Sequence, residues 1–77
     1  IVKGSLDFPL INAGSVAVKP EIIVDSRFSV KVNDEKPIVF EAGSKQDYYL
    51  SLRPGVNDVH VEGTGTIKFH YQKEVMG

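Results

Sequence analysis

The chain has 77 residues, of which 42% are hydrophobic and 25% are charged, and its formal net charge is −1. Such a composition is typical of one small globular domain, whose core is too small to be divided. Lysines are scattered among carboxylates, which argues against nucleic acid as a partner, because phosphate neutralisation needs a clustered basic face. No apolar run reaches the length of a membrane span, so no membrane partner is expected. Cysteine is absent, which excludes a disulfide framework and a thiolate metal site.

The N-terminal segment is predicted to lie at the edge of a sheet. The chain starts at the strand-like Ile1 rather than at methionine, and we expect residues 1–77 to be one domain excised from a larger chain. Residues 6–11 are extended but contain Pro9, which has no backbone donor, so they are predicted to form a weak edge strand or an irregular segment. Turn-forming residues follow at 12–15.

The middle of the chain alternates short strands with turns. Strands are predicted at 16–24, with 22–24 as the firmest part, at 27–32 and at 37–41, with turns at 25–26 and 33–36 and a loop at 42–45. Alternation gives these strands an apolar inward face, which consists of Phe28, Val30, Val32, Ile38 and Phe40. No window shows helical periodicity.

Residues 48–71 are predicted to form three consecutive strands, because apolar residues recur at every second position. Their inward face comprises Tyr48, Leu50, Leu52, Val59, Val61, Ile67, Phe69 and Tyr71. In the turn at 53–56, Pro54 precedes Gly55 at the position where a type II turn requires a positive φ. The chain is expected to reverse there.

A second reversal is predicted at Gly63-Thr64-Gly65, as a hairpin with a three-residue loop. This loop would pair Val61 with Ile67 and Val59 with Phe69. A two-residue loop would instead set Val61 against a lysine, and a slip of one residue moves every side chain to the other face. The apolar pairing therefore favours the three-residue loop.

Short strands separated by turn signals at roughly 8- to 12-residue spacing are the pattern of a β-sandwich or a small barrel. A single sheet made of these strands could not bury its apolar face, so two sheets must stack. The predicted fold class is therefore all-β: a small antiparallel β-sandwich with six to seven short strands and no helix.

The polar face of the predicted hairpin is the candidate site. In the predicted register, Asp58 lies opposite His70 and His60 lies diagonal to it, with Lys68 among them. Such a cluster could bind a divalent metal or do acid–base chemistry, but the lysine disfavours a metal ion and an open strand face offers no pocket. A solvated face is therefore favoured, and we predict no catalytic, cofactor-binding or metal-binding residue.

Two further observations bear on function. The sequence contains no G-x-S-x-G, phosphate-loop or H-E-x-x-H motif, so no enzyme is predicted. Alternation places Tyr49 on the outward face, where an amphipathic ring is unusual unless another surface covers it. The candidate partner-docking surface thus consists of Tyr49, Asp58, His60, Lys68 and His70.

The order of the motifs resembles a known family. The segments that carry the resemblance are Asn12-Ala13-Gly14, Pro20 before Ile22-Ile23-Val24, Leu52-Arg53-Pro54-Gly55-Val56-Asn57-Asp58-Val59, and Gly63-Thr64-Gly65-Thr66-Ile67-Lys68-Phe69-His70-Tyr71. They match the patterns N-x-G, P-x-I, L-x-P-G-x-N-x-V and G-x-G-x-I-x-F-x-Y. From Asn12 onward the chain resembles the C-terminal domain of distal tail proteins of bacteriophages and prophages with long non-contractile tails.

The resemblance implies a jelly-roll, galectin-like sandwich from the C-terminal part of a virion protein made in the cytoplasm of a bacterial host. In that family a separate N-terminal domain forms a hexameric ring that continues the tail tube. The implied role is an adaptor in the tail-tip hub, which holds receptor-binding or other baseplate proteins and catalyses no reaction. The isolated domain is expected to be a monomer.

Two alternatives remain open. A carbohydrate-binding module would use an exposed ring on a galectin-like face, and the chain offers Tyr49 and Tyr71 but no tryptophan. An immunoglobulin-like module is weakened by the missing Cys…Trp…Cys core.

Overall fold

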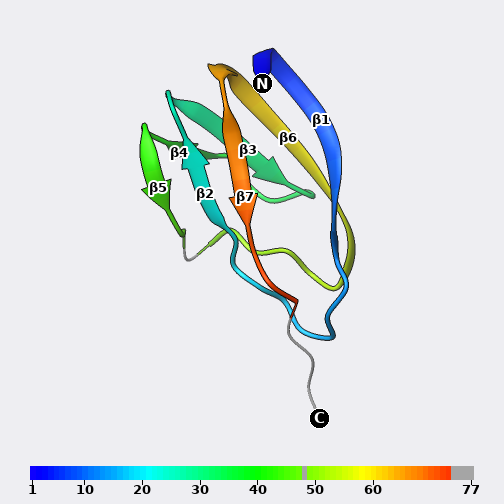
Figure 1. The fold of residues 1–77 in the computed structure, drawn as a ribbon. Coiled ribbons are helices and arrows are strands. Elements are labelled where there is room, and N and C mark those ends of the chain that lie inside the picture. The colour runs from blue at the N-terminus through cyan, green and yellow to red at the C-terminus, as the bar shows by residue number, and fades with distance from the viewer. Residues whose placement is uncertain (48, 74–77) are drawn as a thin grey trace.

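The computed structural model describes residues 1–47 and 49–73, which form seven strands in two antiparallel sheets (Figure 1). The strands are β1 (Val2–Asn12), β2 (Glu21–Val24), β3 (Phe28–Val32), β4 (Ile38–Phe40), β5 (Gly43–Lys45), β6 (Gly55–Gly65) and β7 (Ile67–His70). The predicted fold class, a small all-β sandwich, is confirmed. The described residues contain no helix, and so none that could cross a membrane.

One sheet has the strand order β1-β6-β3-β4 and the other has the order β5-β2-β7. Among consecutive strands, only β3 and β4 are neighbours in the same sheet, so every other connection between described strands crosses from one sheet to the other. Figure 1 shows the consequence: β7, β2 and β5 lie in front of the larger sheet, and β1 lies at its far edge.

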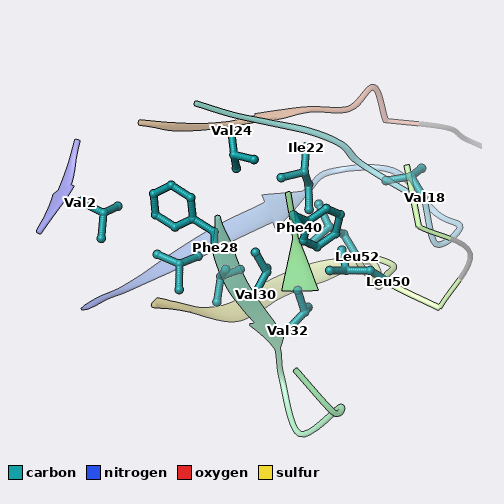
Figure 2. Packing of buried hydrophobic residues seen from close by; sticks show 12 residues of the cluster. Val2, Val18, Ile22, Val24, Phe28, Val30, Val32, Phe40, Leu50 and Leu52 are labelled. Carbon is teal, nitrogen blue, oxygen red and sulfur yellow. The ribbon is translucent and has the colours of Figure 1, made fainter. Parts of the chain in front are cut away.

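The core lies between the sheets, where side chains from both meet (Figure 2). It consists of Val2, Val18, Ile22, Val24, Phe28, Val30, Val32, Phe40, Leu50, Leu52, Val59 and Val61. The residues of 27–61 that were predicted to face inward and that the structure describes are buried, and Ile38 is partly buried. Partly exposed residues also pack against the core in the last part of the chain, at Ile67, Phe69 and Tyr71. Tyr48 lies outside the described residues.

The predicted hairpin at residues 63–65 is wrong. β6 pairs with β1 and β3, whereas β7 pairs with β2 in the other sheet. Val61 lies opposite Leu6 and Val30, and Phe69 lies opposite Ile22. Alternation identifies the core-facing residues correctly in both strands, but it does not specify which sheet a strand joins.

Gly63 is required for a close approach rather than for a loop. A Cβ atom there would lie 2.7 Å from the carbonyl oxygen of Arg27 and 2.8 Å from Cδ1 of Phe28, and its φ is 149°. Gly63 lies opposite Phe28 in the register of β6 and β3. The glycine lets the buried phenylalanine pack against the backbone of the neighbouring strand.

Three predicted segments differ in extent. The weak strand at residues 6–11 is an 11-residue strand, and it does form the edge of its sheet, as Pro9 suggested. Residues 43–45, predicted as loop, form β5. The first of the three strands predicted in residues 48–71 does not form among the described residues, and Leu52, although buried as predicted, makes only an isolated bridge with Val18.

Two buried asparagines organise one end of the sandwich. Asn12 and Asn57 are the buried polar side chains of the described residues, at 1% and 0% exposure. Nδ2 of Asn12 donates to the carbonyls of Val16 and Leu52 at 2.9 and 3.0 Å. Asn57 holds the turn that leads into β6, whose first residue, Gly55, has the predicted positive φ, at 95°.

Candidate functional site

The structure divides the predicted docking residues among three places. Asp58 and His60 lie on β6 in the four-stranded sheet, whereas Lys68 and His70 lie on β7 in the three-stranded sheet. Tyr49 lies in the connection between β5 and β6. The residues flanking Asp58, His60, Lys68 and His70 along each strand are buried or pack against the core, so the two pairs face outward from opposite sides of the sandwich.

The predicted proximity of Asp58 and His70 is therefore wrong, because it depended on the hairpin. Asp58 lies opposite Pro9, and His70 lies opposite Glu21. His60 lies opposite Asp7 on one side and Lys31 on the other. The structure creates a different cluster around His60.

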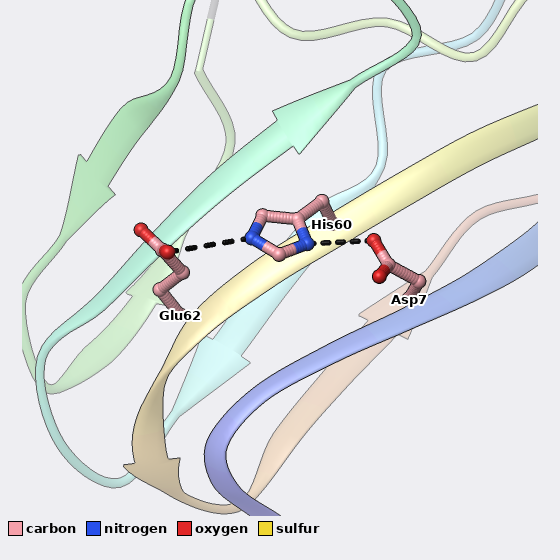
Figure 3. Close-up of polar contacts among 3 residues, drawn as sticks. All are labelled: Asp7, His60 and Glu62. Carbon is pink, nitrogen blue, oxygen red and sulfur yellow. Dashed lines mark hydrogen bonds and ion pairs between the residues drawn. The ribbon is translucent and has the colours of Figure 1, made fainter.

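This cluster consists of Asp7, His60 and Glu62, on the outer face of the four-stranded sheet (Figure 3). Nδ1 of His60 lies 2.6 Å from Oδ1 of Asp7, and Nε2 lies 3.4 Å from Oε1 of Glu62. Asp7 comes from edge strand β1, whereas His60 and Glu62 are two residues apart on β6 and share a face. The imidazole is held between two carboxylates.

The two carboxylates raise the pKa of His60 above its ordinary value of 6.5. The hydrogen bond to Asp7 is the larger cause and the one to Glu62 the next, while partial desolvation acts in the opposite direction. Both ring nitrogens donate when the imidazole is protonated. Protonation of His60 therefore tightens the connection between β1 and β6.

The geometry limits what chemistry the cluster can do. A catalytic histidine uses one nitrogen to accept a proton from a nucleophile while a carboxylate orients the other. In His60 both nitrogens face carboxylates, so neither faces a hydroxyl group. Residues 1–47 and 49–73 also include no group of three or more histidine, cysteine or acidic side chains that could hold a metal ion. The geometry provides an imidazole between two carboxylates at an open sheet face.

Shallow hollows flank these residues. One of about 520 Å³ is lined by Asp7, Phe8, Pro9, Lys31, Asn33, Asp58, Val59 and His60. Another, of about 760 Å³, lies on the other sheet and is lined by Ala17, Val18, Lys19, Glu21, Gln46, Phe69, His70, Tyr71 and Gln72. The first adjoins the His60 cluster, and both are open to solvent.

Tyr49 is 80% exposed, as predicted, but it lies in a turn rather than in the predicted strand. Its backbone N–H donates to Oδ1 of Asp47 at 2.9 Å, which fixes the local backbone. The residue lines a third hollow, of about 480 Å³, together with Glu35, Lys36, Pro37, Ile38 and Asp47. The aromatic ring is thus presented beside a small, mostly apolar surface.

Asp7 and Lys31 were not among the site residues predicted from the sequence. Both lie next to His60 because β6 lies between β1 and β3 in the sheet. Asp7 and His60 are 53 residues apart in the sequence. The sequence did contain one signal for this contact, because Asp7 is an acidic residue at an outward position of a predicted edge strand. Nothing local to residues 55–65 indicates which strands flank them.

No family model, no curated protein and no solved structure matches the chain.

Proposed function

We propose that this chain is a non-enzymatic structural domain of a bacteriophage or prophage tail-tip hub, where it docks baseplate or receptor-binding proteins. The proposal starts from the resemblance of its motifs to the C-terminal domain of distal tail proteins. In that role the domain offers outward faces to other proteins of the virion, and it binds neither nucleic acid nor a cofactor.

The observation that carries the proposal concerns the motif asparagines. Asn12 of N-x-G and Asn57 of L-x-P-G-x-N are the two buried polar side chains of the described residues, and both bond to backbone groups of the loops around them. The motif positions on which the resemblance rests are thus positions that this fold uses to shape its loops, and this is what supports the proposal.

The outward faces suit protein docking. Asp7, Lys31, Asp58, His60 and Glu62 place both signs of charge on one open sheet face. Mixed charges of this kind steer and orient a protein partner more than they add affinity. A small-molecule site would instead be concave and mostly apolar, with a few fixed polar groups.

Immunolabelling of virions tests the proposal. An antibody raised against residues 1–77 is applied to tailed particles from a strain that carries the gene, and the particles are viewed by negative-stain electron microscopy. We expect label at the tail tip, and tail-tube and tape-measure genes beside this gene. Antibody absorbed with the purified domain is the control. Particles without label, with the protein in the host wall fraction, would reject the proposal.

A second candidate function is carbohydrate binding, favoured by the exposed ring of Tyr49 beside the hollow that contains Pro37, Ile38 and Asp47. Sugars stack on such rings when polar groups border them. A glycan array followed by titration of each hit separates the two functions. Binding that Tyr49→Ala abolishes and Tyr49→Phe retains would support the sugar module, whereas the docking proposal predicts no glycan hit.

A further inference from the structure

The smaller sheet leaves part of the larger one uncovered. Leu6 lies opposite the fully buried Val61, so its side chain points to the core side of β1, yet it is 45% exposed. Phe8 and Leu10 follow on the same side and are only partly buried. Figure 1 shows why: the three strands of the smaller sheet lie in front of the left part of the molecule, and no strand lies in front of β1. The core is open along this flank.

The free edge of β7 borders this flank. Within residues 1–47 and 49–73, β7 pairs only with β2, so its other side is an edge of the three-stranded sheet. The rings of Phe8 and Phe69 meet edge to face at a centroid distance of 5.6 Å, and the hydroxyl of Tyr71 donates to the carbonyl of Ile11 at 3.1 Å. These contacts place the edge of β7 above the inner face of β1.

The backbone of β7 has groups available at that edge. The N–H of Asp25 donates to the carbonyl of Thr66 at 3.2 Å, so the backbone carbonyl of Thr66 points toward the β2 side. Along an antiparallel strand, every second residue directs its backbone N–H and C=O groups toward a given neighbour. The backbone groups of Lys68 and His70 therefore also point toward β2. The N–H and C=O groups of Ile67 and Phe69 therefore face away from β2, toward the free side.

The outer face of β7 is basic. Lys68 and His70 are exposed, and Lys68 forms no ion pair within residues 1–47 and 49–73. Their partners on β2 are Ile23 and Glu21, and Glu21 already accepts a hydrogen bond from Oγ of Ser44 at 2.7 Å. If a strand paired with the free side of β7, its outward side chains would lie next to Lys68 and His70.

The geometry points to β-strand addition: we infer that the free edge of β7 binds an extended segment of a protein partner in which apolar residues alternate with acidic ones. Its backbone would pair with Ile67 and Phe69, its apolar residues would cover Leu6 and pack beside Phe8, and its acidic residues would face Lys68 and His70. This inference rests on the proposed docking function and specifies how the partner is held.

The other edges fit such a segment less well. β4 and β5 are three residues long, which is the usual way in which an edge is protected from pairing. A strand on the free side of β1 would extend the larger sheet further and leave Leu6 uncovered, and Pro9 lacks a donor there. Of the edges that the described strands present, β7 is the one where backbone pairing would also bury open core.

The probe for this inference is an acetylated, amidated eight-residue peptide in which valine alternates with glutamate, added to the isotope-labelled domain. We expect the amides of Ile67 and Phe69 to gain protection from hydrogen exchange by about tenfold or more, and the resonances of Leu6 and Phe8 to shift. The same peptide with every backbone nitrogen methylated should have no effect, because it cannot donate to the edge.

Charge reversal supplies the matched variant. Lys68 is exposed, so Lys68→Glu leaves the core intact; it should weaken binding of the glutamate peptide by about fivefold or more and favour a peptide with lysine in place of glutamate. Unchanged protection at Ile67 and Phe69, or binding to which Lys68→Glu makes no difference, would overturn the inference. Label at the tail tip together with either of those results would leave the docking function standing and reject strand addition alone.

Discussion

The side chain of Asn57 holds the backbone of Arg53, four residues earlier in the chain. Nδ2 of Asn57 donates to the carbonyl of Arg53 at 2.9 Å, and Oδ1 accepts from the N–H of Arg53 at 3.0 Å. The same amide donates to the carbonyl of Gly55 at 3.2 Å and accepts from Nδ2 of Asn33 at 3.0 Å. One buried side chain therefore shapes the turn and joins it to the end of β3.

Replacement of this side chain should be costly. Asn57→Ala leaves part-buried backbone groups of the turn without partners, and we expect the free energy of unfolding to fall by about 1 to 3 kcal/mol. This is a large part of the roughly 4 to 11 kcal/mol expected for a domain of this size. Urea denaturation measures the loss. The neighbouring exposed residue gives the control, since Asp58→Ala should change stability by about 0.5 kcal/mol or less.

Alanine substitutions at two glycines measure the costs of backbone strain and of steric contact separately. Gly4 and Gly63 both have positive φ, at 90° and 149°, but a Cβ atom meets nothing within 4 Å at Gly4 and approaches the Arg27 carbonyl to 2.7 Å at Gly63. Alanine at either position should cost about 1 to 3 kcal/mol through backbone strain. Gly63→Ala should cost a further 1 to 3 kcal/mol or so through overpacking. Equal thermal stability of the two variants would contradict the packing of Phe28 against β6.

The His60 cluster predicts a pH dependence of stability. The pKa of His60 is raised in the folded chain, so its contribution to stability is fully present below the unfolded value of 6.5 and is lost as pH rises through the folded value. Asp7→Asn removes the larger cause and should lower the pKa of His60 more than Glu62→Gln does. Titration of the His60 ring resonances by NMR measures both shifts. An unaltered titration in Asp7→Asn would show that the contact in Figure 3 does not form in solution.

The isolated domain should be a monomer. Its exposed large hydrophobic side chains form only two small groups, Ile11 opposite Val56 and Leu6 beside the partly buried Phe8 and Leu10, and the others described are dispersed. A stable protein interface buries about 800 Å² on each partner, which dispersed side chains do not supply. Multi-angle light scattering measures the mass directly. A stable hexamer of residues 1–77 would contradict the expectation that ring formation belongs to another domain.

The sequence predicted the core better than the topology, and the reason is physical. Phe28, Val30 and Val61 are recognisable because alternation is a property of a single strand. The pairing of β1 with β6 depends on contacts between residues about 50 positions apart, such as Leu6 with Val61, and no local pattern encodes them. The Asp7–His60 pair was missed for this reason, and the exposure of Tyr49 was predicted correctly although the strand assumed for it does not form.

The assignment of β6 and β7 to different sheets is the feature on which the site and the strand-addition inference both depend. Cross-strand nuclear Overhauser effects test it most directly. The structure predicts contacts of Val61 with Leu6 and Val30, and of Phe69 with Ile22. Contacts of Val61 with Ile67 and of Val59 with Phe69 would instead show a hairpin at residues 63–65, which would remove both the Asp7–His60 cluster and the free edge of β7.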